Sequence, residues 1–336
     1  MDIREVFDVI DMHAAGEPLR IILSGYPRVL GRTVLEKRQY LQEHLDHLRR
    51  KLMWEPWGHE DMYGCLLVEP ERPDSLYGLI FMHNEGYSTM CGHATIAVTK
   101  MVVETGRVPV PADGEKVTVR FDVPSGQVEA HAHMRDGRVH HVEFENVPAF
   151  PVALDIEVAV DEQPICLDVS FGGAYYAIVD SASLGLAVTP ENVDAFRAWA
   201  AKIKPAVEEL HLTQHPEDPR LNSLYGVIFT DAPEASSHHS RNITVFADGQ
   251  VDRSPCGSCL SSRLAALDAK KEIERHQPVE VESVIGTSFT GQVIGDGPQV
   301  GDFSTVRTTV AGQASWLGFR RFFSNPHDPV EPFLVR

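Results

Sequence analysis

Two Cys-Gly pairs constrain this sequence more than any other feature. Cys91-Gly92 lies in STMCGHATIAVTKMVV, and Cys256-Gly257 lies in RSPCGSCLSSRLAALDA. Each pair stands immediately before a helical run of small and apolar residues, and each follows a strand-like segment, LIFMHN or ITVFAD. The two cysteines are about half the chain length apart. We therefore expect two structurally similar halves, each presenting one cysteine at the start of a helix.

Short segments rich in β-branched and aromatic residues dominate the rest of the chain and predict strands. They cover residues 7–13, 20–25, 64–70, 77–83, 116–126, 140–147, 175–180, 224–231, 241–247 and 290–295. Helical spacing of apolar residues predicts helices over residues 34–52, 94–104, 195–210 and 260–271. Many short strands with few helices indicate an α+β fold rather than a doubly wound sheet.

The length of 336 residues exceeds the size at which a single core usually stops growing, so we expect two domains. We place them at residues 1–160, carrying Cys91, and 161–336, carrying Cys256. The extreme C-terminus is a candidate to pack on the first half.

The net charge of −18, from 48 acidic and 30 basic side chains, disfavours nucleic acid and anionic membranes as partners. The N-terminal segment carries acids where a signal peptide would carry basic residues, and no long apolar run suggests a membrane span. Five scattered cysteines are too few for a disulfide framework in a chain this long. These features indicate a soluble protein of the reducing cytoplasm.

A cysteine at a helix N-terminus is placed for acid/base chemistry. The backbone N–H groups and the positive end of the helix dipole stabilise a thiolate there. The glycine that follows lets the backbone approach a ligand closely, and successive N–H groups can hold a carboxylate.

Proton transfer at the α-carbon of an amino acid needs such a site. Donors aimed at the substrate carboxylate act where the carbanion charge develops. Inversion of the carbon needs one group to remove a proton from one face and a second group to deliver one to the opposite face. Cys91 and Cys256 could do this as a thiolate and a thiol, with no cofactor and no metal.

Other interpretations compete at single residues. Cys65 and Cys166 are expected to be small buried side chains. Cys256 and Cys259 form a C-x-x-C, which could be a redox pair or half of a zinc site, although no further zinc ligands stand out nearby. Asp252 alone could be a turn or cap residue, and His93 alone could be a packed or solvated histidine.

The motifs together resemble the proline racemase superfamily, whose members include proline racemase, 4-hydroxyproline epimerase and trans-3-hydroxy-L-proline dehydratase. The similar segments occur in the family's order and extend over essentially the whole chain. They are MHAAGEPLR (12–20), GHEDMYG (58–64), FMHNEGYSTMCGHATIA (81–97), FGGAYYA (171–177), VDRSPCGS (251–258) and TSFTGQV (287–293). The resemblance implies the diaminopimelate-epimerase-like fold, with the active site in a cleft between two similar α/β halves.

The resemblance also implies roles for individual residues. Cys91 and Cys256 would be the acid/base thiols, and Asp252 with His93 would bind the ring ammonium of a proline or hydroxyproline. The substrate carboxylate would be held by the backbone N–H groups of Gly92, His93, Gly257 and Ser258. The rings of Tyr63 and Phe246 would enclose the substrate ring. A homodimer is an expectation at the level of the family only.

Two features of the sequence favour different reactions within the family. The segment HNEGYSTMCGHA resembles the dehydratase branch, yet that branch typically carries threonine at the position of Cys256. Two thiols suit exchange on two faces, so the sequence favours a racemase or epimerase, with the dehydratase as the alternative. Two further departures from the family pattern bear on the choice of substrate. Cys259 stands where family members often have glycine, and Ala14-Ala15 replaces a more polar pair. A silent binding protein is the third hypothesis, and the intact motifs speak against it.

Overall fold

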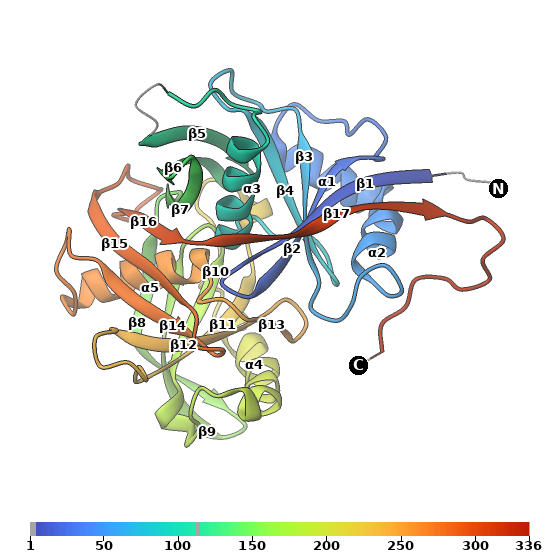
Figure 1. Ribbon diagram of the computed structural model, residues 1–336. Coiled ribbons are helices and arrows are strands. Elements are labelled where there is room, and N and C mark those ends of the chain that lie inside the picture. Colours follow the sequence, from blue (N-terminus) through green and yellow to red (C-terminus); the bar gives the residue numbers. More distant parts are fainter. Residues whose placement is uncertain (1–4, 112–114, 336) are drawn as a thin grey trace. The chain divides into compact units, whose positions relative to one another are not determined.

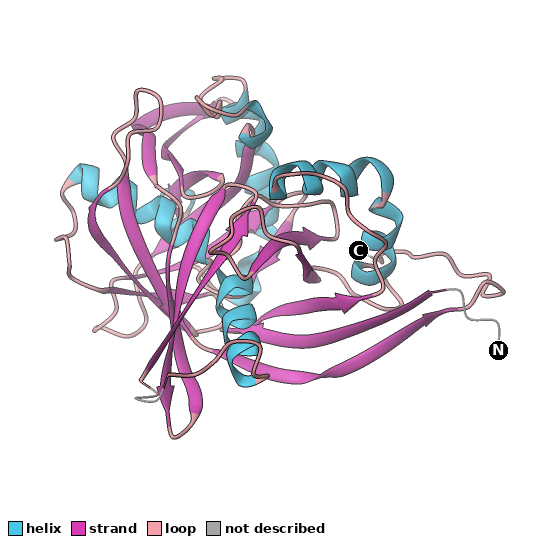
Figure 2. Ribbon diagram, turned by 90° about the horizontal axis from the view of Figure 1, so that it is seen from above, coloured by secondary structure: helices cyan, strands magenta, loops and turns pink. Residues whose placement is uncertain are grey.

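The computed structural model describes residues 5–111 and 115–335, and the chain forms two compact units (Figure 1). The first unit combines Met1–Val142 with Gln313–Arg336, and the second is Glu143–Gly312. Figure 2 shows that strands make up most of the regular structure, as an α+β composition requires.

The division differs from the expected boundary after residue 160 because of strand pairing. Strand β8 (Phe150–Val160) pairs antiparallel with β9 (Gln163–Phe171) through a two-residue turn, which keeps β8 in the second unit. Strand β17 (Ala314–Ser324) pairs antiparallel with β1 (Glu5–Ala14) along its whole length, so the end of the chain belongs to the first unit. The division between the two units falls within β7 (Arg138–Glu145), after Val142.

The strands of the first unit are neighbours in the order β17-β1-β2-β3-β4-β5-β6. The pairings along this order are antiparallel, antiparallel, parallel, antiparallel, parallel and antiparallel. The strands not yet bounded are β2 (Glu17–Ser24), β3 (Tyr63–Val68), β4 (Tyr77–His83), β5 (Lys116–Val123) and β6 (Gly126–Arg135).

Three helices belong to the first unit: α1 (Val34–His44), α2 (Asp46–Met53) and α3 (Gly92–Glu104). The single helix expected over residues 34–52 is therefore two helices, which separate at Leu45, whose φ of −127° is not helical. α3 is buried over most of its length and packs against β1, β2, β6 and β17, so its apolar sequence is explained by burial on all sides.

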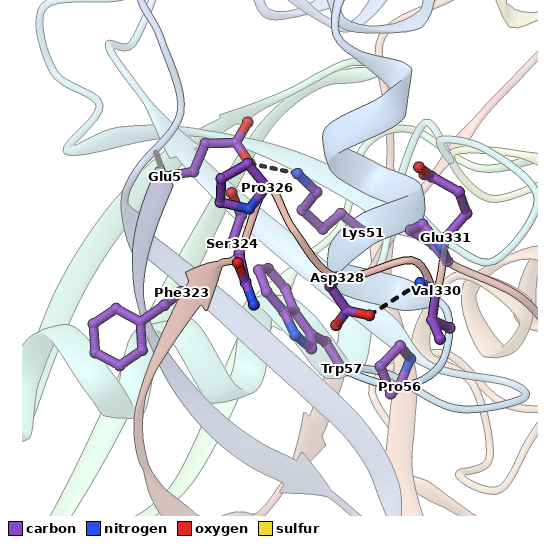
Figure 3. Close-up of a pocket in the computed structure, with 12 residues that line it drawn as sticks. Glu5, Lys51, Pro56, Trp57, Phe323, Ser324, Pro326, Asp328, Val330 and Glu331 are labelled. Carbon is purple, nitrogen blue, oxygen red and sulfur yellow. Dashed lines mark hydrogen bonds and ion pairs between the residues drawn. The ribbon is translucent and has the colours of Figure 1, made fainter. Parts of the chain in front are cut away.

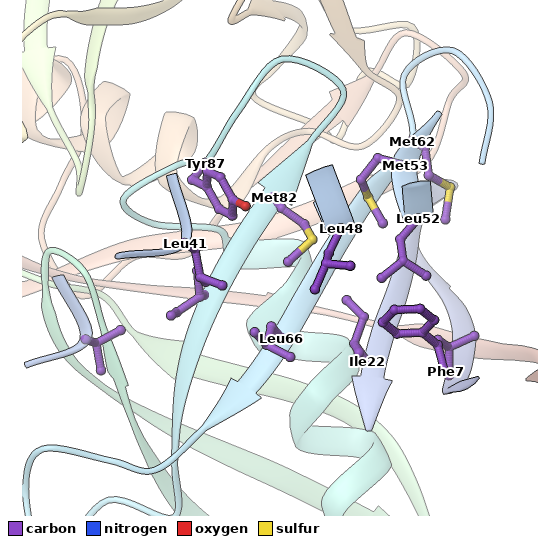
Figure 4. Close-up of a cluster of buried hydrophobic side chains, with 13 residues drawn as sticks. Phe7, Ile22, Leu41, Leu48, Leu52, Met53, Met62, Leu66, Met82 and Tyr87 are labelled. Carbon is purple, nitrogen blue, oxygen red and sulfur yellow. The ribbon is translucent and has the colours of Figure 1, made fainter. Parts of the chain in front are cut away.

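Side chains from α1 and α2 pack on the sheet of the first unit in one apolar cluster (Figure 4). Leu41, Leu48 and Leu52 come from the helices and are almost inaccessible to solvent. Phe7 and Ile22 meet them from β1 and β2. This burial fixes both helices against the strands of the first unit.

The strands of the second unit are neighbours in the order β8-β9-β10-β11-β12-β14-β15-β16. The first six pairings repeat the succession found in the first unit: antiparallel, antiparallel, parallel, antiparallel, parallel and antiparallel. The strands not yet bounded are β10 (Tyr175–Asp180), β11 (Leu224–Asp231), β12 (Ser240–Phe246), β13 (Gln250–Asp252), β14 (Val279–Ser283), β15 (Ser288–Asp296) and β16 (Val306–Gly312).

Helices of the second unit are α4 (Val193–Glu208) and α5 (Gly257–Lys270), with short 3₁₀ turns at Ser181–Leu184, Pro190–Asn192 and Pro219–Leu221. α4 packs against β8, β11 and β12, and α5 packs against β8, β9, β10, β15 and β16. Both helices were expected within a few residues of these bounds, and every expected strand forms.

Gly172, in the segment FGGAYYA, lets the chain pass very close to the first turns of α5. A β-carbon placed there would lie 2.4 Å from the Ser258 carbonyl oxygen and 2.5 Å from the Ser262 backbone nitrogen. Ser170 supports the same contact by donating a hydrogen bond to the Ser262 carbonyl at 2.8 Å. The helix start at Cys256 is therefore positioned by a close backbone approach that tolerates no side chain.

We predict that Gly172→Ala lowers the free energy of unfolding by about 1–3 kcal/mol, because the added methyl group must push α5 away. Gly318→Ala is the matched control, since a β-carbon at Gly318 meets no atom within 4 Å. Urea unfolding of both variants measures the difference. Equal stability of the two variants would show that the approach of Gly172 to α5 is looser than described.

Candidate active site

Cys91 is the N-cap residue of α3, and its sulfur lies next to a backbone N–H group and an imidazole ring. The Cys91 sulfur accepts a hydrogen bond from the Ala94 backbone N–H at 3.4 Å, and it lies 3.2 Å from His93 Nδ1. Cys91 is buried and keeps its thiol. A helix N-terminus and an adjacent imidazole both favour a thiolate, so this residue is suited to remove a proton.

Tyr63 and His93 lie beside this cysteine in the first unit. Their ring centroids are 4.8 Å apart in an edge-to-face arrangement. The Tyr63 hydroxyl is 2.5 Å from the Ser88 hydroxyl, and both residues are buried. The structure therefore brings together Cys91, His93 and Tyr63, three of the residues that the resemblance implied, and adds Ser88.

Cys256 is the N-cap residue of α5, and its sulfur is bonded to that of Cys259, one turn into the helix. In this form Cys256 has no thiol proton to exchange, so the expected acid/base role applies only to a reduced form. The disulfide gives weight to the redox interpretation of the C-x-x-C. Cys256 also has φ 60° and ψ 115°, a backbone conformation that residues with a β-carbon rarely adopt, and such strain is often found at functional sites.

Asp252 organises the turn that leads into Cys256. Its Oδ1 accepts hydrogen bonds from the Ser254 backbone N–H at 2.8 Å and from the Ser254 hydroxyl at 2.7 Å. The Ser254 hydroxyl in turn accepts one from the Cys256 backbone N–H at 3.1 Å. Burial of the carboxyl group raises the pKa of Asp252 to about 6, although both Ser254 contacts and Arg253 act in the opposite direction.

Ser258 and Phe246, the other implied side chains of the second unit, each have an aromatic neighbour. The Ser258 hydroxyl is 2.8 Å from the Tyr176 hydroxyl and 3.7 Å from the Cys256 sulfur. The Phe246 ring is stacked with that of Tyr225 at a centroid distance of 5.5 Å. Phe246 is nearly inaccessible to solvent.

The first backbone hydrogen bonds of the two helices return to the cysteines themselves. The Thr95 N–H donates to the Cys91 carbonyl at 3.2 Å, and the Leu260 N–H donates to the Cys256 carbonyl at 2.9 Å. The N–H groups of the intervening first turns, at Gly92 and His93 and at Gly257 and Ser258, point toward the helix N-terminus and do not take part in this ladder. They are suited to an anion such as a carboxylate.

The two cysteines that were expected to be small buried side chains differ in their exposure. Cys65 is fully buried, and burial raises the pKa of its thiol, as expected of a core residue. Cys166 is exposed on β9, so the expectation of burial was wrong for this residue. The alternating pattern of β9 turns Cys166 away from the core while Ile165 and Leu167 face it.

A pocket elsewhere in the first unit is lined by Glu5, Lys51, Trp57 and the segment 323–332 (Figure 3). Glu5 and Lys51 form an ion pair at its rim. None of the implied site residues lines it, so we assign it no part in the acid/base chemistry. Within residues 5–111 and 115–335, no cluster of three or more His, Cys, Asp or Glu side chains could hold a metal ion. No helix in the same ranges is long and apolar enough to cross a membrane.

Sequence reasoning missed Ser88, Ser254, Tyr176 and Tyr225. Three of these were signalled by their places within segments already recognised: Ser88 lies three residues before Cys91, Ser254 lies between Asp252 and Cys256, and Tyr176 lies in FGGAYYA. Tyr225 carries no comparable signal, because an aromatic residue within a strand usually indicates only core packing.

We predict that the effect of Asp252→Asn on stability depends on pH. The folded-state pKa of about 6 lies above the ordinary value of 3.8, so ionisation of Asp252 costs stability as the pH rises through this interval. The free energy of unfolding of Asp252→Asn, minus that of the unmodified protein, should therefore increase by about 1–3 kcal/mol between pH 4 and pH 7. Urea unfolding at several pH values measures this difference, and a constant difference would contradict the raised pKa.

Comparison of the chain with known proteins gives the same family that the sequence motifs resemble. The family model described as proline racemase matches residues 9–332. The chain is 43% identical over 331 residues to a trans-3-hydroxy-L-proline dehydratase of Bacillus thuringiensis, with 98% of each chain covered. It is also 43% identical over 341 residues to the human protein of the same name, with 98% of this chain and 95% of the relative covered.

A solved structure of a hydroxyproline epimerase from Agrobacterium vitis, with bound trans-4-hydroxy-L-proline, is similar throughout. Its TM-score is 0.91 at 27% identity, covering 100% of this chain and 97% of the other. The mixed α/β fold expected from the sequence is therefore that of this family. The match to the family model and the full-length relatives lead to one conclusion: the chain belongs to the proline racemase family.

Proposed function

We propose that the protein is a trans-3-hydroxy-L-proline dehydratase that uses Cys91 as its base and gives a pyrroline-2-carboxylate. This reverses the preference drawn from the two cysteines alone, which favoured a racemase or epimerase. The 43% identity to proteins named as trans-3-hydroxy-L-proline dehydratases, over nearly the whole chain, supports the dehydratase.

One structural observation carries the proposal: only one of the two helix-start cysteines has a thiol. Cys91 keeps its thiol at the start of α3, 3.2 Å from His93, whereas Cys256 is bonded to Cys259. A reaction that needs one acid/base thiol is compatible with this arrangement. Inversion, which needs a group on each face of the substrate, is not compatible with it until the disulfide is reduced.

The stereochemistry of the substrate explains why one thiol suffices. In trans-3-hydroxy-L-proline the carboxylate and the 3-hydroxyl lie on opposite faces of the ring. The α-hydrogen is opposite the carboxylate, so it lies on the same face as the 3-hydroxyl. A single side chain on that face can therefore reach both the hydrogen that is removed and the oxygen that leaves.

The proposed reaction balances with Cys91 alone. The Cys91 thiolate takes the α-hydrogen as a proton and becomes a thiol, and the carbanion charge is spread into the substrate carboxylate. The electron pair then forms the C2–C3 double bond as the C3–O bond breaks. The thiol proton goes to the departing hydroxide, which leaves as water and regenerates the thiolate. The resulting enamine tautomerises to the pyrroline.

The remaining implied residues bind the substrate in this proposal. The N–H groups at Gly92, His93, Gly257 and Ser258 hold the carboxylate and stabilise the charge that develops there. The side chains that contact the ring and its nitrogen are Asp252, His93, Tyr63 and Phe246. With a pKa of about 6, Asp252 is largely ionised at neutral pH and can pair with the ring ammonium.

A second candidate function is the epimerisation of proline or 4-hydroxyproline. It is favoured by the equivalent placement of Cys256 and Cys91, each the N-cap residue of a buried helix. It also fits the bound hydroxyproline of the epimerase from Agrobacterium vitis. This activity would require Cys256 in its reduced form.

We predict that Cys91→Ser lowers kcat/KM for dehydration of trans-3-hydroxy-L-proline by about 10³-fold, because a serine hydroxyl is a far weaker acid than a thiol. Cys256→Thr is the matched variant at the other helix start, and it should stay within about threefold of the unmodified protein. Product formation is followed by reducing the pyrroline with a coupled dehydrogenase.

The choice of substrate isomer provides the control. In cis-3-hydroxy-L-proline the α-hydrogen and the hydroxyl lie on opposite faces, so one thiol cannot serve both, and dehydration should be at least about 10²-fold slower. Equal rates for the two isomers, or full activity of Cys91→Ser, would contradict the single-thiol mechanism.

A further inference from the structure

The Cys256–Cys259 disulfide lies at the start of α5 and is built from one turn of that helix. The two Cα atoms are 5.2 Å apart, within the range usual for disulfides. Consequently the bond requires no distant segment to move when it opens or closes. The neighbouring residues Tyr176 and Ile228 pack around both sulfur-bearing side chains in one apolar cluster.

The two sulfur atoms differ in their surroundings in the way that a reactive and a resolving cysteine differ. Cys256 is the more accessible of the two, at 9% against 1% for Cys259. Cys256 is also the N-cap residue, where the helix dipole favours a thiolate. The Cys259 sulfur is held inside the unit and accepts a hydrogen bond from the Thr244 hydroxyl at 3.4 Å.

We propose that Cys256 and Cys259 form a reversible thiol–disulfide switch that decides whether the enzyme has a second acid/base thiol. This inference rests on the proposed function and concerns regulation of the same site. With the disulfide closed, Cys91 alone carries the chemistry, and only dehydration is available. With the disulfide open, Cys256 can exchange a proton on the opposite face of the substrate, so α-proton exchange of D-proline and inversion become available as well.

The closing step needs an oxidant, for which we name glutathione disulfide. The Cys256 thiolate attacks one sulfur of glutathione disulfide, so a mixed disulfide forms and one glutathione thiolate leaves. The Cys259 thiol then loses its proton and attacks the Cys256 sulfur. The internal disulfide forms, the second glutathione leaves as a thiolate, and the thiolate and thiol have together lost two electrons and one proton. A thiol such as dithiothreitol reverses both steps.

The switch is independent of the base that dehydration uses. Cys91 belongs to the first unit and has no cysteine at the corresponding place one turn into its helix, where Ala94 stands. Cys91 therefore cannot form the one-turn disulfide that Cys256 forms with Cys259. Retained dehydration reports that the Cys91 thiol is intact, while loss of D-proline exchange and of inversion reports the state of Cys256.

The test compares the protein in a glutathione disulfide buffer and after dithiothreitol. Mass spectrometry of the peptide containing both cysteines gives the redox state without reference to activity. Dehydration of trans-3-hydroxy-L-proline is measured by the coupled assay. Exchange of the α-proton of L- and D-proline and of the 4-hydroxyproline isomers is followed by NMR in heavy water.

We expect that oxidation closes the pair and leaves both dehydration and the α-proton exchange of L-proline within about twofold. It should lower the α-proton exchange of D-proline and inversion at least about tenfold, with full recovery after reduction. Cys259→Ser should keep the exchange activity of the reduced protein in the same buffer, because it cannot form the internal disulfide. Cys166→Ser is the matched control and should respond like the unmodified protein, since Cys166 is exposed on β9 and outside the pair.

Three results would overturn the switch: a pair that stays reduced in the oxidising buffer, D-proline exchange and inversion that are the same in both redox states, or a reduced protein that neither exchanges the α-proton of D-proline nor inverts any substrate. Failure of the proposed function has a different signature. If neither redox state dehydrates trans-3-hydroxy-L-proline while exchange still follows the redox state, the switch stands and the dehydratase assignment falls.

Discussion

Burial of two helix N-termini is the constraint on which the rest of the structure depends. α3 and α5 are enclosed by strands, so the N–H groups of their first turns cannot all be satisfied by bulk water. Each helix begins at a cysteine. The Cys91 sulfur accepts a hydrogen bond from the Ala94 N–H, whereas the Cys256 sulfur is bonded to Cys259 and makes no capping hydrogen bond. The close approach of Gly172 and the turn built on Asp252 keep the second of these starts in place. A bound carboxylate would complete the same arrangement, which links the folding constraint to the proposed chemistry.

Much of this could be predicted from the sequence, because the decisive signals are local. Cys-Gly followed by small and apolar residues predicted both α3 and α5, and the β-rich segments predicted strands that all form. What the sequence could not predict depends on tertiary pairing. The helix expected over residues 34–52 separates at Leu45, and β8 and β17 were missed because half-exposed strands carry a weak pattern. The boundary expected after residue 160 differs from the division after Val142, since pairing with β9 keeps β8 in the second unit.

The site shows a similar division between what is local and what is not. Cys91, His93 and Tyr63 were expected together and lie together. The sequence offered the bond between Cys256 and Cys259 only as one interpretation of a C-x-x-C among several, because spacing alone does not distinguish a disulfide from two separate thiols. In the proposed mechanism this bond decides which reaction is available. It removes the thiol of Cys256, which inversion would need, and leaves that of Cys91, which suffices for syn loss of water from a trans-3-hydroxy substrate.

NMR of trans-3-hydroxy-L-proline in heavy water, with the Cys256–Cys259 disulfide intact, tests the central claim most directly, because it follows the fate of the α-hydrogen and of the C2 configuration in one time course. The account predicts that the substrate is converted to a pyrroline-2-carboxylate carrying solvent deuterium at C3, where the enamine tautomerises, and that the remaining substrate keeps its C2 configuration. Accumulation of the C2 epimer with deuterium at C2, and no pyrroline, would contradict it and return the assignment to a two-thiol epimerase.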